Sequence, residues 1–408
     1  MNVLMLTTSF PYPPTHGGAL RVWNILVQVA QRHAVTLLAM VPRDGEPSPE
    51  ALAEVRNRVK RVELVPLPQT LSTRIWNGVG SLCGRGPYTI ANFRFDAFER
   101  KIRELRAEED FGLIHCHYLH IAQYHEAFGD TARYFDCQNI NRYLWERYAE
   151  APTTGLFARL FAQHQARLLQ RYEPEIWRHF DVATFCSEEE RDYALERQPD
   201  AAFHVSPNGV DCSFFQPFET EPEPHTIVFS ASMNATQNID AAVFLGEDIF
   251  PLIQARYPDS MLYLVGQKPA PEVRRLATDK IVVTGTVDDV RPYAERAAVY
   301  VAPIRIGGGT RLKILEAMAM AKPVVSTRVG AEGIRCAAGE HIVLADSPEG
   351  FASSVLSLFE HPEERRKLGR AGRELVESTY EWNAIGEKIA HYYDIACANA
   401  VRRRGRRA

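Results

Sequence analysis

Short apolar runs alternate with longer stretches of helical spacing along the chain. Runs of this length that are almost continuously apolar are typical of parallel strands buried on both faces. They occur in both halves of the chain: NVLMLTT, AVTLLAMV, RVELVPL, FGLIHCH, ARYFDC and DVATFCS, then HTIVFSAS, SMLYLVG, KIVVTG, AVYVAPI and KPVVSTR. Apolar strands joined by helices predict an α/β fold with two Rossmann-like, doubly wound parallel sheets in succession.

The length and the punctuation of the chain indicate where the domains divide. A chain of 408 residues exceeds what one hydrophobic core usually encloses. Asn208-Gly209 is a turn signal, and three prolines punctuate the acidic segment that follows it. We expect an N-terminal domain at 1–205, a C-terminal domain at 206–378, a helix at 379–398 that packs back on the N-terminal domain, and a basic tail at 399–408.

Several features of the sequence predict a cytoplasmic protein. The first residues, MNVLMLTTSF, have the pattern of a buried strand and lack the charged start and the cleavage site of a secretory signal. No apolar run approaches the roughly 18 residues that are needed to cross a bilayer. The seven cysteines are scattered and include no Cys-x-x-Cys pair, which favours reduced thiols over disulfides or zinc.

The arginine-rich segment VRRRGRRA contrasts with a chain whose formal net charge is -4. Two interpretations stay open. One is a solvated terminus, and the other is contact with anionic lipid, to which each basic residue near the surface contributes about 1 kcal/mol. Lipid contact would place the protein peripherally on the inner face of the cell membrane. No basic stripe with interleaved aromatic residues accompanies the tail, so a nucleic-acid partner is not expected.

The segment PIRIGGGTRLKILEAMAMAKPVV, at 303–325, places three glycines between an apolar run and a helical pattern. A glycine-rich turn that leads into a helix presents free amide N–H groups and the positive end of the helix dipole to an anion. We therefore expect Gly307, Gly308 and Gly309 to approach a phosphate, with Thr310 as the N-cap of the helix. A second loop, TTSFPYPPTHGGALRVWNIL, likewise places Gly17 and Gly18 before a helix and after a strand.

Charged side chains follow the triple glycine within two turns. Arg311 and Lys313 supply positive charge at the start of the helix, and Glu316 is suited to accept hydrogen bonds from the vicinal hydroxyls of a ribose. Amides, cations and one carboxylate together favour a nucleotide diphosphate that carries a sugar. A flexible turn with solvated cations is the alternative. No Walker pattern and no Gly-x-Gly-x-x-Gly is present, so kinase and dinucleotide sites lack their signatures.

The segment LIHCHYLH offers three histidines, His115, His117 and His120, near the end of a predicted strand. Alternation along a strand directs His115 and His117 to one face and Cys116 to the other. No carboxylate or cysteine with ligand spacing is evident beside them, so we expect no metal site. A hydrogen-bonded structural role is the alternative to a functional one.

Several of these motifs resemble the family-four retaining glycosyltransferases. The C-terminal domain of that family is similar to VSPNGVD, YLVG, VTGTVDDVRPYAERAAVYVAPIRIGGGTRLKILEAMAMAKPVVST and GAEGI, and its N-terminal domain more loosely to PYPPTHGGALRVWNI and FGLIHCHYLH. The bacterial branch that builds exopolysaccharide and other surface glycans is the most similar. The resemblance implies the GT-B architecture, in which two Rossmann-like domains face each other across a donor cleft.

The resemblance also implies roles for single residues. His117 matches a histidine that contacts the donor sugar, and Glu316 matches a glutamate that holds the nucleotide ribose. Another family glutamate falls on Gly308, so backbone amides of the loop are expected to take over part of the sugar recognition. A family arginine and lysine that hold phosphate fall on Ser232 and Asn238. We expect Arg311 and Lys313 to replace their charge, with Arg305 in reserve.

The implied reaction is hexosyl transfer from a nucleotide diphosphate sugar to a hydroxyl of a glycan or lipid-linked acceptor, with retention at the anomeric carbon and without metal or another cofactor. Helix N-termini and basic side chains meet the charge of the leaving group. Two alternatives stay open: an inactive GT-B scaffold or sensor that binds nucleotide sugar, and a GT-B epimerase of sugar nucleotides. The expected catalytic residues are His117, Arg311 and Lys313, and the expected donor-binding residues are Gly17, Gly18, Gly307, Gly308, Gly309, Thr310 and Glu316.

Three further segments carry weaker signals. The helical pattern at 153–177 is expected to pack in the core through its leucines and phenylalanines, with a membrane-surface role of Arg159, Arg167 and Arg171 as the alternative. The irregular, aromatic segment at 72–95 is expected to contact the acceptor. For Asp136 and Arg142 two interpretations stay open, a cleft lining and a structural pair.

Overall fold

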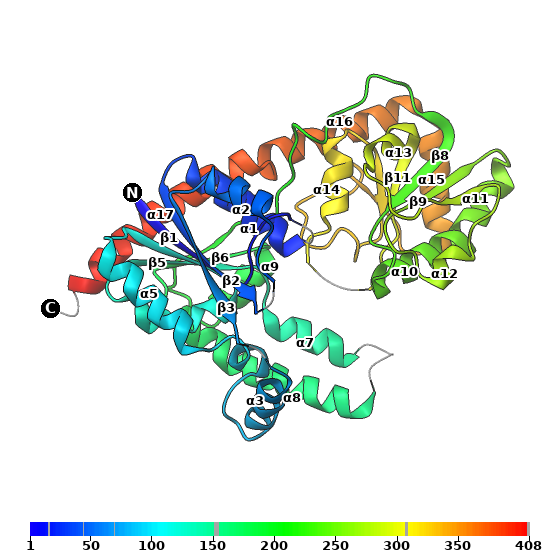
Figure 1. The fold of residues 1–408 in the computed structure, drawn as a ribbon. Coiled ribbons are helices and arrows are strands. Elements are labelled where there is room, and N and C mark those ends of the chain that lie inside the picture. Colours follow the sequence, from blue (N-terminus) through cyan, green and yellow to red (C-terminus); the bar gives the residue numbers. More distant parts are fainter. Residues whose placement is uncertain (15–16, 44, 69, 151–154, 307–308, 406–408) are drawn as a thin grey trace. The chain divides into compact units, whose positions relative to one another are not determined.

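The computed structural model contains two compact units (Figure 1). It describes the chain except for residues 15–16, 44, 69, 151–154, 307–308 and 406–408. The first unit consists of Met1–Pro207 together with Ile385–Ala408, and the second of Asn208–Ala384. Each unit is built on a parallel β-sheet with helices on both of its faces, as the apolar runs predict.

The sheet of the first unit has seven strands in the order β3-β2-β1-β4-β5-β6-β7. Their bounds are β1 Asn2–Thr7, β2 Ala34–Pro42, β3 Arg61–Leu67, β4 Leu113–His117, β5 Ala132–Cys137, β6 Val182–Phe185 and β7 Phe203–Val205. The helices are α1 Gly17–Ala30, α2 Pro49–Arg56, α3 Leu71–Leu82, α4 Tyr88–Ala91, α5 Asp96–Glu108, α6 Leu119–Ala122, a 3-10 turn at His125–Phe128, α7 Asn141–Glu150, α8 Leu156–Trp177 and α9 Glu188–Leu195. Because β1 lies between β2 and β4, the strand order reverses at β1, which is where doubly wound sheets bind ligands.

The sheet of the second unit has six strands in the order β10-β9-β8-β11-β12-β13. Their bounds are β8 Glu223–Ser230, β9 Met261–Val265, β10 Ile281–Val283, β11 Ala297–Ala302, β12 Val324–Ser326 and β13 Val343–Leu344. The helices are α10 Thr236–Val243, a π-helical turn Phe244–Ile249, α11 Phe250–Arg256, α12 Pro271–Arg274, α13 Arg291–Arg296, α14 Leu312–Ala319, α15 Pro348–Glu360 and α16 Pro362–Thr379. The order reverses at β8, so the loops after β8 and β11 flank the equivalent ligand position.

The last helix, α17, spans Trp382–Gly405 and packs on the first unit for most of its length. Ile389 and Tyr393 are fully buried, and the Tyr393 hydroxyl lies 2.6 Å from Nδ1 of His115. The basic tail expected from residue 399 is helical as far as Gly405. Arg403 pairs with Asp181 at 2.9 Å, and Arg404 donates to the backbone carbonyl of Asp130 at 2.7 Å. These two arginines are therefore bound to the domain and do not form a separate solvated arm.

The helical pattern at 153–177 forms α8, but only part of it packs in the core as expected. Leu169 is fully buried, while Leu156, Phe157 and Leu160 at the start of α8 are exposed. The segment at 72–95 is mostly helical, because it contains α3 and α4. The expectation of an irregular segment is therefore wrong for most of it.

Candidate functional site

In the first unit, the sheet register places two polar side chains of neighbouring strands side by side. His117 ends β4 and is paired in register with Asp136 of β5. Both side chains are fully buried, and Nδ1 of His117 lies 3.0 Å from Oδ2 of Asp136. A buried carboxylate is costly unless a charge partner and hydrogen bonds satisfy it.

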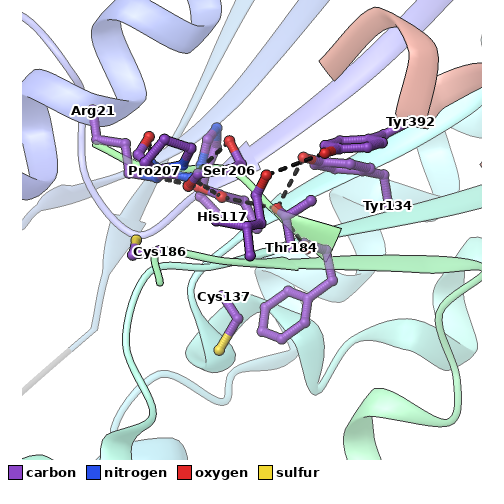
Figure 2. A network of polar contacts seen from close by, with 12 residues as sticks. Arg21, His117, Tyr134, Cys137, Thr184, Cys186, Ser206, Pro207 and Tyr392 are labelled. Atoms are coloured by element: carbon purple, nitrogen blue, oxygen red, sulfur yellow. Dashed lines mark hydrogen bonds and ion pairs between the residues drawn. The ribbon is translucent and has the colours of Figure 1, made fainter. Parts of the chain in front are cut away.

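That charge partner is Arg21, which is on α1, one turn after Gly17. Its Nε and Nη2 donate to the two oxygens of Asp136 at 2.9 and 2.5 Å. The same guanidinium also donates to the backbone carbonyls of Ser206 and Pro207 at 2.9 and 2.8 Å (Figure 2). The fork geometry of arginine therefore joins α1, β5 and the segment after β7.

The ionisation of this network follows from its contacts. Burial alone would raise the pKa of Asp136, but the Arg21 charge and the His117 hydrogen bond outweigh burial and hold this pKa well below its usual range. Burial would likewise lower the pKa of Arg21, and the Asp136 charge raises it above its usual value instead. Thr184 adds a hydrogen bond to Asp136 at 3.2 Å and is itself 2.9 Å from the Tyr134 hydroxyl (Figure 2).

One ring nitrogen of His117 is hydrogen-bonded and the other is buried without a partner among the described residues. Burial lowers its pKa and Asp136 only partly opposes this, so the ring is neutral at pH 7. Because Asp136 is ionised, Nδ1 carries the proton and donates it to the carboxylate. Nε2 is buried and has no hydrogen-bond partner among the described residues. His117 therefore keeps one unpaired acceptor nitrogen inside the first unit.

The cluster of His115, His117 and Asp136 has the composition of a metal site, with possible ligand atoms within 4.8 Å of one another. Asp136 is the carboxylate partner that the sequence analysis did not find beside the histidines. Its two oxygens are, however, bonded to the Arg21 guanidinium, and Nδ1 of His115 is bonded to Tyr393. A divalent ion would have to displace a buried cation, so this donor set does not fit a metal.

The expected site residues of the second unit lie on and before α14, which follows the loop after β11. Lys313, in the first turn, is partly buried, and its Nζ donates to Oδ1 of Asn238 on α10 at 2.9 Å. The ammonium also lies 4.7 Å from the centre of the Phe229 ring. Asn238 in turn donates to the backbone carbonyl of Ser232 at 2.9 Å. Lys313 therefore holds its charge beside Asn238, which in turn is bonded to the loop after β8.

Lys313 and Glu316 are partly buried neighbours whose pKa values are shifted in opposite directions. Burial and, to a smaller extent, the Arg311 charge lower the pKa of Lys313 to about 7, and Glu316 opposes the change. Burial raises the pKa of Glu316 to about 7 against the attraction of Lys313. Neither charge is fully compensated by the protein, so an anion beside Lys313 would favour its protonated form.

The glycine loop differs from expectation at its cap. The N-cap of α14 is Arg311, and no side-chain hydrogen bond caps the helix, so the assignment of Thr310 is wrong by one residue. The Thr310 hydroxyl lies within 3.4 Å of the Gly333 carbonyl instead. Gly309 has φ of 79°, a left-handed conformation that favours glycine. Gly307 and Gly308 lie outside the described residues.

The other residues that the sequence singled out lie outside these two clusters. Gly17 and Gly18 begin α1, and Gly17 is exposed. Arg305 forms a bidentate pair with Asp240 at 3.1 and 2.7 Å, which leaves it a poor reserve for phosphate. The ring of His120, on α6, packs 4.7 Å from that of Phe93. Arg142 pairs with Glu146 at 2.7 Å.

The contact of Asp136 with Arg21 was missed at the sequence level. An aspartate at the end of an apolar central strand, and an arginine beside the apolar stripe of α1, were the available signals. A charged side chain that is buried at such a position requires a buried partner of opposite charge.

Comparison with known proteins agrees with this architecture. Residues 224–361 match the family model described as glycosyl transferases group 1. Phosphatidyl-myo-inositol mannosyltransferase of Mycolicibacterium smegmatis is 25% identical over 330 residues, which cover 78% of this chain and 80% of that protein.

Solved structures match nearly the whole chain. Sucrose-phosphate synthase from Thermosynechococcus elongatus has a TM-score of 0.67 at 17% identity, covering 97% of this chain and 98% of the other. Anabaena Alr3699/HepE in complex with UDP has a TM-score of 0.63 at 13% identity, covering 97% and 100%. The fold is that of the GT-B glycosyltransferases. The chain is thus similar to the glycosyltransferases of group 1, through the matched part of its second unit and through a relative that covers most of its length.

Proposed function

We propose that the protein transfers a sugar from a nucleotide diphosphate sugar to a hydroxyl of a glycan or lipid-linked acceptor, with retention and without a metal ion. The observation that carries this proposal is the contact of Lys313 with Asn238. It brings a cation to the end of β8, where the family cations are missing. A diphosphate there would meet Lys313 and the N-terminal amides of α14 together.

Glu316 supports the same donor class. It lies one turn after Lys313 on α14, so a nucleotide whose diphosphate contacts Lys313 would place its ribose within reach of the carboxylate. Two ribose hydroxyls donating to Glu316 would favour its ionised form. Nucleotide binding would then favour the protonated form of Lys313 and the ionised form of Glu316.

The reaction that we propose is attack by the acceptor hydroxyl on the same face from which the nucleotide leaves. The bond between the anomeric carbon and the phosphate oxygen breaks, and the acceptor oxygen forms the new bond. The acceptor proton passes to a β-phosphate oxygen of the leaving nucleotide. Lys313 and Arg311 meet the charge that develops there.

The acceptor that we propose is lipid-linked, for surface polysaccharide synthesis at the inner face of the cell membrane. Two similar proteins support a lipid acceptor by their names, the Mycolicibacterium smegmatis enzyme above and a Corynebacterium glutamicum enzyme that is a GDP-mannose-dependent phosphatidylinositol monomannoside mannosyltransferase. Among the described residues, no helix is both long enough and apolar enough to span a bilayer.

The test is incubation of the purified protein with a panel of GDP- and UDP-sugars and a membrane lipid extract. We expect release of nucleotide diphosphate in step with glycolipid formation, retained anomeric configuration by NMR, and a rate that EDTA leaves unchanged. Isomerised sugar without nucleotide release would identify an epimerase instead. Donor binding without turnover under any donor would identify a scaffold. Loss of activity in EDTA that magnesium or manganese restores would overturn the metal-independent assignment.

A further inference from the structure

Helix α3 of the first unit exposes an apolar face to solvent. Its aliphatic side chains recur at the spacing of one helical stripe, and all of them are exposed: Leu71, Ile75, Val79 and Leu82. Trp76 lies beside this stripe and is 72% exposed. Exposed apolar stripes of this size usually mark an interaction surface, because a soluble protein normally turns such a face toward its core.

A second apolar surface lies at the start of α8. Leu156, Phe157 and Leu160 are exposed, and Phe157 is 87% exposed. Further along the same face of α8, at helical spacing, stand the exposed arginines Arg167 and Arg171. The face therefore changes from apolar to basic along one helix.

The two surfaces belong to one substructure of the first unit. The end of α3 is bonded to α8, because Gln165 donates to the Ser81 hydroxyl at 2.7 Å and His164 Nε2 lies 2.9 Å from the Ser81 carbonyl. Figure 1 shows α3 beside α8 at one end of this unit. We call this substructure, α3 with the first half of α8, the apolar end.

The charged side chains of the two sequence segments that contain the apolar end are all basic, whereas α7, which packs on α8, carries both signs. No aspartate or glutamate occurs from residue 64 to residue 95 or from residue 151 to residue 172. The same two segments contain six arginines: Arg74, Arg85, Arg94, Arg159, Arg167 and Arg171. On a chain of net charge -4 this is a local reversal of sign, and a complementary partner must be anionic as well as apolar.

We propose that the apolar end docks on an anionic lipid bilayer surface, with Trp76 and Phe157 at the level of the headgroups and the arginines on lipid phosphates. A helix with an exposed apolar stripe and flanking arginines lies in the plane of such an interface. Tryptophan is favoured there because its ring is apolar with one polar group. The inference deepens the proposed function and rests on it for the lipid-linked acceptor. It replaces the arginine tail, whose Arg403 and Arg404 are engaged in the domain, as the membrane contact.

The experiment is sedimentation of the full chain with vesicles of phosphatidylcholine alone or of equal parts phosphatidylcholine and phosphatidylglycerol. We expect binding to the anionic vesicles that weakens as salt rises. The double variant Leu71→Ser with Ile75→Ser should lower the partition coefficient at least about tenfold. The matched control, Leu252→Ser with Val401→Ser, changes exposed aliphatic residues elsewhere and should bind as the unchanged protein does.

The fluorescence of Trp76 gives a second readout. Its emission should shift to shorter wavelength with anionic vesicles, and Trp76→Phe should lose most of that shift. Equal vesicle binding by the test and control double variants would overturn the proposal. So would concentration-dependent association without vesicles that the Leu71→Ser, Ile75→Ser variant abolishes, because the face would then join two copies of the chain. Nucleotide-sugar binding, measured by calorimetry without lipid, reports on the donor site separately.

Discussion

Each unit holds a polar cluster near the carboxyl ends of its central strands. The two clusters differ in how completely charge partners and hydrogen bonds within the protein compensate their charges. In the first unit, Asp136 accepts hydrogen bonds from Nε and Nη2 of Arg21 and from His117, and all three side chains are buried. In the second unit, Lys313 has one amide oxygen and an aromatic ring near it, and Glu316 lies beside it.

This difference indicates that the first cluster stabilises the fold, whereas the second can respond to a bound ligand. The pKa of Asp136 is held well below its usual range, so no change near neutrality alters its charge. The pKa values of Lys313 and Glu316 are both shifted to about 7, where a ligand can change them at little cost. We expect the first cluster to control stability and the second to control donor binding and transfer.

The largest expected effect is on stability, from the first cluster. Arg21→Met leaves the Asp136 carboxylate buried and without its charge partner, which should destabilise the protein by about 3–5 kcal/mol. Urea unfolding and hydrogen exchange of β4 and β5 measure this, and adding Asp136→Asn should recover part of the loss. Arg305→Met, which removes an exposed pair with Asp240, should cost about 0–1 kcal/mol. Equal effects of the two arginine variants would contradict the contrast between the clusters.

The next effect is on the rate of transfer, from the second cluster. Lys313→Met should lower kcat about 100- to 1,000-fold, the range found when one preorganised donor to a developing negative charge is removed. The Kd for the nucleotide sugar should rise less than kcat falls. Lys367→Met, at an exposed lysine of α16, should leave both constants unchanged. A rise in Kd with an unchanged kcat would show that Lys313 binds the ground state only.

Glu316 should affect binding more than bond breaking. Glu316→Ala removes a charge-assisted hydrogen bond, worth about 1.5–3 kcal/mol, to a part of the donor that does not react. Calorimetry should show at least about tenfold weaker binding of the nucleotide diphosphate. Unchanged affinity would remove the ribose assignment.

The smallest effect is a pH dependence that distinguishes the two residues. Lys313 binds a diphosphate when protonated, and its pKa of about 7 means that affinity falls as pH rises above 7. Glu316 accepts from hydroxyls when ionised, and its pKa of about 7 means that affinity falls as pH drops below 7. Affinity for a nucleotide sugar should therefore peak near pH 7, with limbs of up to about tenfold per pH unit. Lys313→Met should flatten the alkaline limb, and Glu316→Gln the acid one.

Much of the fold followed from pattern alone, because long buried strands have a clear signature. The strands that the sequence did not predict, β7 and β13, have three and two residues and lie at the edges of their sheets. So short a segment has no detectable periodicity, and its pairing depends on the strand beside it. The cap of α14 was placed wrongly because the Thr310 hydroxyl lies near the Gly333 carbonyl, 23 residues away.

The site was less predictable, since its contacts join distant residues. The position of Lys313 after the glycines pointed to charge near a phosphate, but its contact with Asn238 spans 75 residues. Arg21 and Asp136 are 115 residues apart, and neither belongs to a motif that names the other. The exposed stripe of α3 has the spacing of a core helix, so only the packed structure shows that nothing in the described residues covers it.

Helix α17 has a consequence for the order in which the protein is assembled during translation. Most of it belongs to the first unit, where Tyr393 bonds to His115 beside the Arg21 network. The ribosome makes all of the second unit before it makes residues 385–405. Most of the first unit therefore leaves the exit tunnel early. One side of its sheet, however, lacks α17 until the second unit has been synthesised. During that interval a nascent-chain chaperone would find its binding surface on the uncovered side of β4 and β5.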